Sequence, residues 1–478
     1  MVTFYLPLIL LSFLFCAPKQ LQIPADLVIS FHSDPLSNDP VFATDIGSIR
    51  LNRLIYKNLF RFDLNGNILP ELAESYQWHQ TNQELTIKLK VLKNQFNQYL
   101  KAEDVAFALS RLQTQKGPRK STANSIMSIN VSGKREIKIK TSKGLNHLLI
   151  LLSMPQAAIY AADSFQNGKL QGWGDYKIIE WNKNNFISLY TNNTHLPKNL
   201  LIRILPNAST SIFLIGKKEL DVMPLPFFLL NHKVVKENTI RSVKGQSVQY
   251  IAINNSNPCF DKNFRQALNL AVNRELAIQH LFYFYADISN GPVPVNFLPN
   301  IKNRYSYDPA KAKNLLETSA CYPQITGNQL EFRMRSDDIN QAVSSVVAQD
   351  LKNIGLKIKI VPMEKTSIYR ENHEKKGDLT LLSWYLDYNS ALNFIDPLFN
   401  SSRLGNGGNR SFYQNRKIDN FIQLAQQQGP KFIDSGLKDI TETISEDAPW
   451  IFLWSIHENY LISVKALQYP ALLKLLYE

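Results

Sequence analysis

Hydrophobic and polar residues alternate along several short segments of the chain with the two-residue period of a β-strand. Every second side chain is apolar in the segments 85–89, 137–140, 330–334 and 356–360. This pattern predicts strands with one buried face and one solvated face. The segments 27–31 and 250–253 are apolar almost throughout, which predicts buried strands.

The segment 330–360 contains a complete unit of strand, helix and strand. Between its two predicted strands, Val343, Val347 and Leu351 recur at helical spacing, and Gly355 follows as a helix stop. A crossover of this kind between parallel strands is right-handed in about 98% of cases. The apolar segment 378–384 predicts a further strand of the same sheet, so the sequence indicates an α/β fold.

A tryptophan and an aspartate, Trp384 and Asp387, follow this last strand. Ligands bind to α/β sheets beyond the carboxyl ends of the strands, which is where Asp387 is expected to lie. A carboxylate on rigid backbone beside an aromatic ring suits a partly desolvated cation, because ion pairs are strongest where water is excluded. The alternative is an ordinary surface aspartate that follows a core tryptophan.

The length and composition indicate a globular protein of two or three domains, with 478 residues of which 44% are hydrophobic. Residues 4–15 form an apolar run that is too short to span a membrane and fits an export signal over residues 1–20. A lipid anchor at Cys16 is less favoured, because Phe15 stands where a small residue is needed. No later stretch is apolar enough to span a bilayer, so we expect a soluble protein in the periplasm or at the outer face of the cytoplasmic membrane.

The charge of the chain does not predict a nucleic-acid partner. The 53 Lys and Arg residues exceed the 40 Asp and Glu residues, which gives a net charge of +13. The basic residues are scattered, however, and no zinc-finger spacing, helix-turn-helix pattern or aromatic-basic ribbon accompanies them. We interpret the excess of positive charge as a solvated surface.

The motifs of an enzyme are also missing from the sequence. The eight histidines are isolated, and neither an HExxH motif nor a Gly-x-Ser-x-Gly elbow occurs. Asp387 and Asp396 are conceivable as a carboxylate pair for glycoside hydrolysis, but the sequence does not give their separation. We therefore expect no catalytic site, no metal and no cofactor.

Cys259 and Cys321 remain as an even pair once Cys16 is removed with the export signal. In an oxidising compartment this pair predicts one disulfide. Two buried free thiols are the alternative, because the sequence does not show whether the two Cα atoms come within bonding range.

The order of short motifs along residues 27–464 resembles the family 5 extracellular solute-binding proteins, which are the peptide-binding components of ABC importers. The resemblance rests on the series as a whole. Its members are Asp63-Leu-Asn-Gly66 with Pro70-Glu-Leu-Ala-Glu-Ser75, Ala102-Glu-Asp-Val105, Gly172-Trp-Gly-Asp-Tyr176, Gly216-Lys-Lys-Glu-Leu-Asp221, Ile253-Asn254, the segment 264–275, the segment 307–316 and Trp384-Tyr-Leu-Asp-Tyr388.

This resemblance implies a two-lobed, periplasmic-binding-protein-like α/β fold with an extra inserted domain. A discontinuous first domain is expected from residues 21–60, 166–244 and 455–478, an inserted second domain from 61–165, and a third domain from 245–454. The ligand is expected between the first and third domains, which a hinge near residues 244–250 and near Trp454 connects.

The resemblance also implies a site. In the oligopeptide binders, the aspartate three residues after the tryptophan pairs with the α-ammonium of the ligand, and Asp387 occupies that position. Trp384 and Tyr388 are candidate walls of the site, and Asn254 is a candidate for ordering a connection between the lobes. The candidates for the carboxyl end of a peptide are Arg370, Arg403 and Arg410.

The implied function is capture of short peptides and their delivery to ABC permease subunits with their ATPases. A monomer is expected, and it would contact the membrane only through the permease or through a lipid anchor. One alternative is a binder of another solute in the same family, such as a nickel complex, haem or an oligosaccharide. Another is a ligand sensor or chaperone without a permease.

Overall fold

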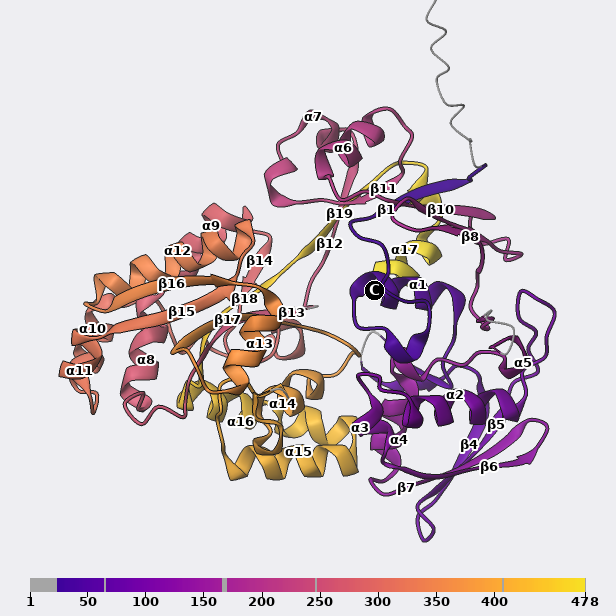
Figure 1. Ribbon diagram of the computed structural model, residues 1–478, viewed down its shortest axis with the longest axis horizontal. Coiled ribbons are helices and arrows are strands. Elements are labelled where there is room, and N and C mark those ends of the chain that lie inside the picture. The colour runs from indigo at the N-terminus through magenta and orange to yellow at the C-terminus, as the bar shows by residue number, and fades with distance from the viewer. Residues whose placement is uncertain (1–23, 64–65, 166–169, 246, 406–407, 478) are drawn as a thin grey trace, which may run out of the picture.

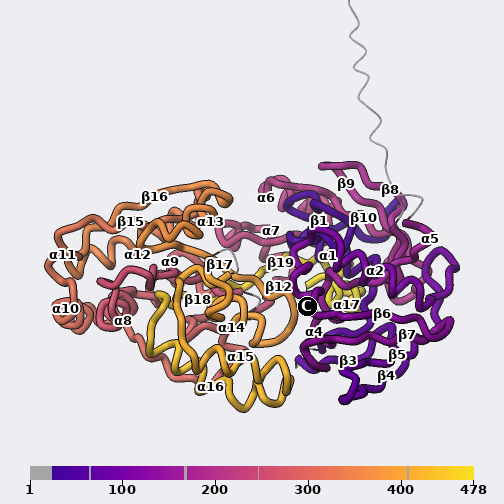
Figure 2. The backbone as a smooth tube through the Cα atoms, turned by 60° about the horizontal axis from the view of Figure 1, so that its bottom comes forward, coloured from indigo at the N-terminus to yellow at the C-terminus, as the bar shows by residue number. Residues whose placement is uncertain are grey.

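Three larger β-sheets and one two-stranded hairpin organise the described part of the protein, and they lie in two lobes (Figures 1 and 2). The computed structural model describes residues 24–63, 66–165, 170–245, 247–405 and 408–477. The expected export signal and Cys16 lie outside these residues. Within the described chain, no helix is both long enough and apolar enough to cross a bilayer.

The first sheet draws on three distant parts of the chain and has the strand order β12-β19-β11-β1-β10-β9-β8. At its centre, β1 runs parallel to β10, with Leu27 opposite Leu200. The strands are β1 (Leu27–Phe31), β8 (Lys177–Asn182), β9 (Phe186–Tyr190), β10 (Asn199–Ile204), β11 (Val222–Pro224), β12 (Thr239–Val243) and β19 (Glu458–Ile462). The accompanying helices are α1 (Ile46–Ile55), α6 (Ala208–Gly216), α7 (Lys233–Lys236) and α17 (Pro470–Tyr477).

The second sheet has the order β4-β5-β7-β6 and is antiparallel throughout. Its strands are β4 (Ala73–His79), β5 (Glu84–Leu89), β6 (Ile126–Gly133) and β7 (Glu136–Thr141), and the small hairpin of β2 (Phe60–Phe62) and β3 (Ile68–Pro70) leads into it. The helices of this region are α2 (Ala102–Thr114), α3 (Lys120–Ala123), α4 (Leu145–Ser153) and α5 (Ala162–Phe165).

The third sheet forms the other lobe and has the order β14-β18-β13-β17-β15-β16. Its strands are β13 (Ser247–Ile253), β14 (Ala286–Ile288), β15 (Gln329–Arg335), β16 (Lys357–Met363), β17 (Leu379–Tyr385) and β18 (Trp450–Ile456). Its helices are α8 (Lys262–Ala271), α9 (Arg274–Phe282), α10 (Pro309–Glu317), α11 (Tyr322–Gly327), α12 (Asp338–Asn353), α13 (Lys365–His373), α14 (Leu392–Phe399), α15 (Arg416–Gln428) and α16 (Pro430–Asp447).

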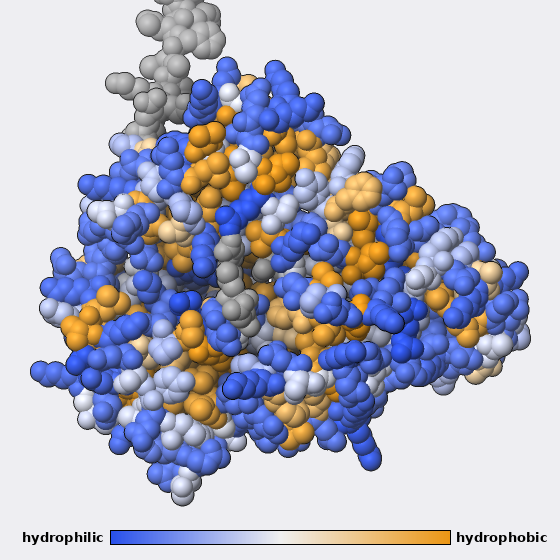
Figure 3. Space-filling view, turned by 180° about the vertical axis from the view of Figure 1, so that it is seen from behind, coloured by the Kyte–Doolittle hydropathy of each residue, from blue (hydrophilic) through white to orange (hydrophobic). Residues whose placement is uncertain are grey.

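The predicted crossover unit is present as β15, α12 and β16, and β17 also runs parallel to β15. The α/β fold class is therefore confirmed. The expected domain boundaries remain a prediction, and the third sheet extends to Ile456, two residues past the expected end of the third domain. A disulfide joins Cys259 to Cys321, with the two Cα atoms 5.1 Å apart. The face seen in Figure 3 is mostly hydrophilic, which is typical of a solvated surface.

His457 lies where the chain passes from β18 in the third sheet to β19 in the first. Its ring is buried, and Nε2 is 2.9 Å from Oδ2 of Asp287. Burial lowers the pKa of His457 below its ordinary value of 6.5, and the Asp287 carboxylate opposes this effect only in part. Lys244, 3.7 Å from the same carboxylate, also disfavours the imidazolium.

We expect the free energy of unfolding to fall when the pH drops below about 6.5, because the unfolded chain then binds a proton that the folded His457 takes up less readily. His457→Gln should flatten this dependence between about pH 5 and 6.5. Urea unfolding at a series of pH values measures both slopes. An unchanged slope in the variant would contradict the assignment.

Candidate functional site: a cavity between the lobes

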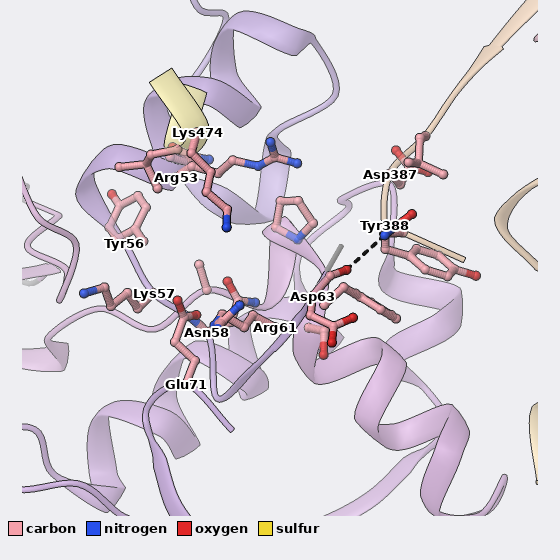
Figure 4. Close-up of a pocket in the computed structure, with 18 of the residues that line it drawn as sticks. Arg53, Tyr56, Lys57, Asn58, Arg61, Asp63, Glu71, Asp387, Tyr388 and Lys474 are labelled. Atoms are coloured by element: carbon pink, nitrogen blue, oxygen red, sulfur yellow. Dashed lines mark hydrogen bonds between the residues drawn. The ribbon is translucent and has the colours of Figure 1, made fainter. Parts of the chain in front are cut away.

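A cavity of about 990 Å³ lies between the two lobes (Figure 4). One wall comes from α1 and α17 of the first lobe, the floor from the hairpin strand β2 and residues beside it, and the opposite wall from residues 386–389 after β17. Its volume is within the range of ordinary ligand pockets, about 300–1,000 Å³.

Helix α1 forms its wall because the sequence buries one side of it and leaves the other side free. The Asp45 side chain accepts from the Ser48 backbone N–H and caps the first turn. Leu51 and Leu54 are fully buried, and Arg53 lines the cavity. The backbone at Gly174 packs closely against the end of the helix. A Cβ at Gly174 would lie only 2.3 Å from the carbonyl carbon of Ile55.

Asp387 lines the opposite wall, beyond the carboxyl end of β17. Its backbone N–H donates to Oδ1 of Asn393 over 3.1 Å, which fixes the turn. Its carboxylate accepts a hydrogen bond from Nη2 of Arg119, and both side chains are 22% exposed. The carboxylate therefore lies in the cavity between the lobes, and in this structure it is already paired with a cation of the protein.

The neighbours of Asp387 join the lobes by two further contacts. The ring of Tyr388 stacks on Phe62, with the centroids 5.3 Å apart. Burial raises the pKa of the Tyr388 phenol, so it is neutral at physiological pH. The side-chain amide of Asn389 donates to the backbone oxygen of Asp63 over 2.9 Å.

The other candidates from the sequence lie elsewhere. Trp384 donates to Oδ1 of Asn393 over 3.3 Å and packs against the core. Asn254 bonds the carbonyl oxygens of Lys375 and Gly377 at the far end of the sheet, because β13 runs antiparallel to β17. These side chains are not among the described residues that line the cavity.

The three arginines proposed for a peptide's carboxyl end are also outside the described lining. Arg370 is exposed on α13. Arg403 pairs with Asp396 at 2.9 Å. The guanidinium of Arg410 lies 3.9 Å from the centre of the Tyr369 ring.

The cavity wall also contains carboxylates that the sequence did not identify as site residues, and these already have partners in the protein. Glu71 accepts from the backbone N–H of Asn58 over 2.7 Å, and burial raises its pKa. Asp175 is 3.4 Å from the ammonium of Lys57. The cationic lining residues Arg53, Arg61 and Lys474 were also missed, because a lysine or arginine that faces a cavity has the same sequence context as one that faces solvent.

Among the described residues, no three His, Cys, Asp or Glu side chains are grouped so that they would hold a metal ion.

The two-lobed α/β fold of the protein is shared by solved structures. DppA from Helicobacter pylori in complex with the peptide STSA matches with a TM-score of 0.75 and 23% identity, over 91% of this chain and 93% of that chain. NikA from Brucella suis in complex with Fe(III)-EDTA matches with a TM-score of 0.80 and 19% identity, over 91% of this chain and 95% of that chain.

Sequence comparison defines the family. The oligopeptide-binding protein AppA from Bacillus subtilis is 24% identical over 91% of this chain and 86% of its own length. The glutathione-binding protein GsiB from Pectobacterium atrosepticum is 27% identical over 90% of this chain and 88% of its own length. Residues 67–406 match the family described as bacterial extracellular solute-binding proteins, family 5 middle. The chain belongs to this family, which confirms the expected membership.

Proposed function

We propose that this protein captures short peptides between its two lobes and delivers them to an ABC permease. The observation that carries the proposal is the carboxylate of Asp387 in the wall of the cavity between the lobes. Relatives named as peptide binders, among them AppA and DppA, support it.

In the proposed complex, the peptide's α-ammonium takes the place that Arg119 has beside Asp387. The amino terminus of a peptide has a pKa of about 8 and is charged at neutral pH. The exchange is feasible because Arg119 is only partly satisfied in this structure, where its buried Nε has no partner among the described residues. Main-chain hydrogen bonds would hold the rest of the peptide with little selection among side chains.

Delivery then follows from closure of the lobes. A ligand that contacts both lobes favours the closed state by its higher affinity for that state, and a permease that recognises the closed state accepts loaded protein. We propose an exported monomer that works with permease subunits and their ATPases and needs no cofactor. The disulfide between Cys259 and Cys321 supports an oxidising compartment.

A carboxylate-rich chelate is the second candidate ligand. The cavity wall contains Arg53 and Lys474, which form no ion pair with the described residues. Structures with a similar fold include NikZ from Campylobacter jejuni in complex with Ni(L-His) and the NikA complex with Fe(III)-EDTA.

Native mass spectrometry of protein purified without denaturation tests the proposal. We expect a series of carried masses that fragment as peptides after release. A single mass of haem or of a metal chelate would contradict peptide capture and favour the second candidate. The absence of any mass gain, even after incubation with a mixed peptide library, would reject peptide capture.

A further inference from the structure

The acidic side chains in the cavity wall have partners in the protein, whereas two of its basic side chains have none among the residues that the structure describes. Its four carboxylates all have partners in the protein: Asp387 pairs with Arg119, Asp175 with Lys57, Glu71 accepts from Asn58 and Asp63 from Asn67. By contrast, neither Arg53 nor Lys474 forms a hydrogen bond or an ion pair through its side chain with any residue that the structure describes. The unmet charge of the cavity is therefore positive.

Arg53 is the more informative of these two cations, because it is partly buried. Burial and the neighbouring guanidinium of Arg50 both lower its pKa, but an arginine remains charged in proteins. Glu458 would be the natural partner, yet it is occupied by Arg50 at 2.6 Å and by the hydroxyl of Tyr460. A partly desolvated cation without a partner is costly, and an anionic ligand group would recover that cost.

Lys474 reaches the same cavity from the last helix, α17, which packs against α1. Figure 4 shows both side chains on the side of the cavity that α1 and α17 form, across from the loop that carries Asp387. A guanidinium offers two parallel donors that match the two oxygens of a carboxylate, and an ammonium adds a point charge beside them.

We propose that Arg53 and Lys474 form a carboxylate-binding subsite, which takes the anionic end of the ligand while Asp387 takes its ammonium. This inference rests on the proposed function, and it adds that the ligand must be zwitterionic. Because the two subsites belong to different lobes, one ligand with both charges would link the lobes and stabilise the closed state. The carboxylate is either the peptide's carboxyl terminus or an acidic side chain.

The test uses a library of tri- to pentapeptides without Asp or Glu, prepared in free, C-amidated and N-acetylated forms. Affinities are compared by native mass spectrometry for the wild type and for Arg53→Gln. We expect amidation to weaken binding to the wild type by about ten- to a hundred-fold, and to have almost no effect on the variant. N-acetylation should weaken both proteins equally.

Arg416→Gln is the matched control, because it removes the same charge from an exposed position at the start of α15. It should behave as the wild type. Arg53→Gln should melt at the same temperature as the wild type or higher, because the change removes the repulsion from Arg50. A loss of binding through misfolding is thereby distinguished from the loss of a ligand contact.

The outcomes separate the inference from the function on which it rests. Equal losses on amidation in the wild type and in Arg53→Gln would overturn the subsite while leaving peptide capture intact. Recovery of amidated peptides by one internal Glu would identify the acidic side chain as the source of the carboxylate. If no peptide binds, citrate serves as the probe. Thermal stabilisation of the wild type but not of Arg53→Gln by citrate would uphold the anion subsite alone. Equal stabilisation of both proteins would overturn the subsite.

Discussion

Replacing Asp387 with asparagine is expected to weaken the binding of peptides with a free amino terminus by roughly 30- to 150-fold. The change keeps the shape of the side chain but removes the charge that pairs with the α-ammonium. This estimate corresponds to about 2–3 kcal/mol, as is usual for a hydrogen bond to a charged group. N-acetylated peptides carry no ammonium, so their affinity should change little. Isothermal calorimetry with each peptide in both forms measures the two effects.

The substitution could also change the free energy of lobe closure. This change affects free and acetylated peptides equally, so it cancels when the two forms are compared on the same variant. This matters because the change Asp387→Asn would also leave Arg119 without its charged partner. Arg119→Gln is the matched variant, since it removes the cation with which the ligand competes. We expect it to increase the preference for free over acetylated peptides. An equal loss for both forms in Asp387→Asn would exclude a role in binding the amine.

The position of Asp387 could be predicted because it depends on local features. Each of these features spans only a few residues: the alternating apolar residues of β15, the apolar stripe of α12 and the helix stop at Gly355. Together they predict a parallel strand-helix-strand unit, and β17 runs beside it. A residue just after β17 must therefore lie at the carboxyl edge of that sheet. These short-range patterns predict the position of Asp387, whereas the cavity between two lobes was implied only by the resemblance to the family.

The cations on the opposite lobe could not be predicted in this way. Arg119 is 268 residues from Asp387 in the sequence, and nothing local indicates that they pair. Arg53 and Lys474 come from opposite ends of the chain, and they line the same cavity because α1 packs against α17. The location of Asn254 could not be predicted for a related reason. The sequence indicates that it follows a strand, but it does not give the direction of β13 relative to β17.

Removal of the disulfide between Cys259 and Cys321 is expected to lower the free energy of unfolding by about 4 kcal/mol. The bond restricts the unfolded chain, and removing it gives the unfolded chain back its conformational entropy. The two cysteines are 62 residues apart, and the loop between them includes α8, α9 and α10. A cross-link over a loop of this length restricts the unfolded chain strongly. The comparison is guanidinium unfolding of the oxidised wild type and of the double variant Cys259→Ser/Cys321→Ser.

Reduction of the wild type provides the control for this experiment, because it breaks the same bond without changing a side chain's size. Both sulfurs belong to partly exposed residues at the edge of the third sheet's helices, so serine should be tolerated there. The reduced wild type and the double variant should therefore unfold at the same denaturant concentration. Unfolding of the oxidised wild type at this same denaturant concentration would refute the expected stabilisation. Recovery of both cysteines as free thiols in peptide mapping would also refute it. Peptide binding should persist in the double variant below its unfolding transition, because neither cysteine lines the cavity.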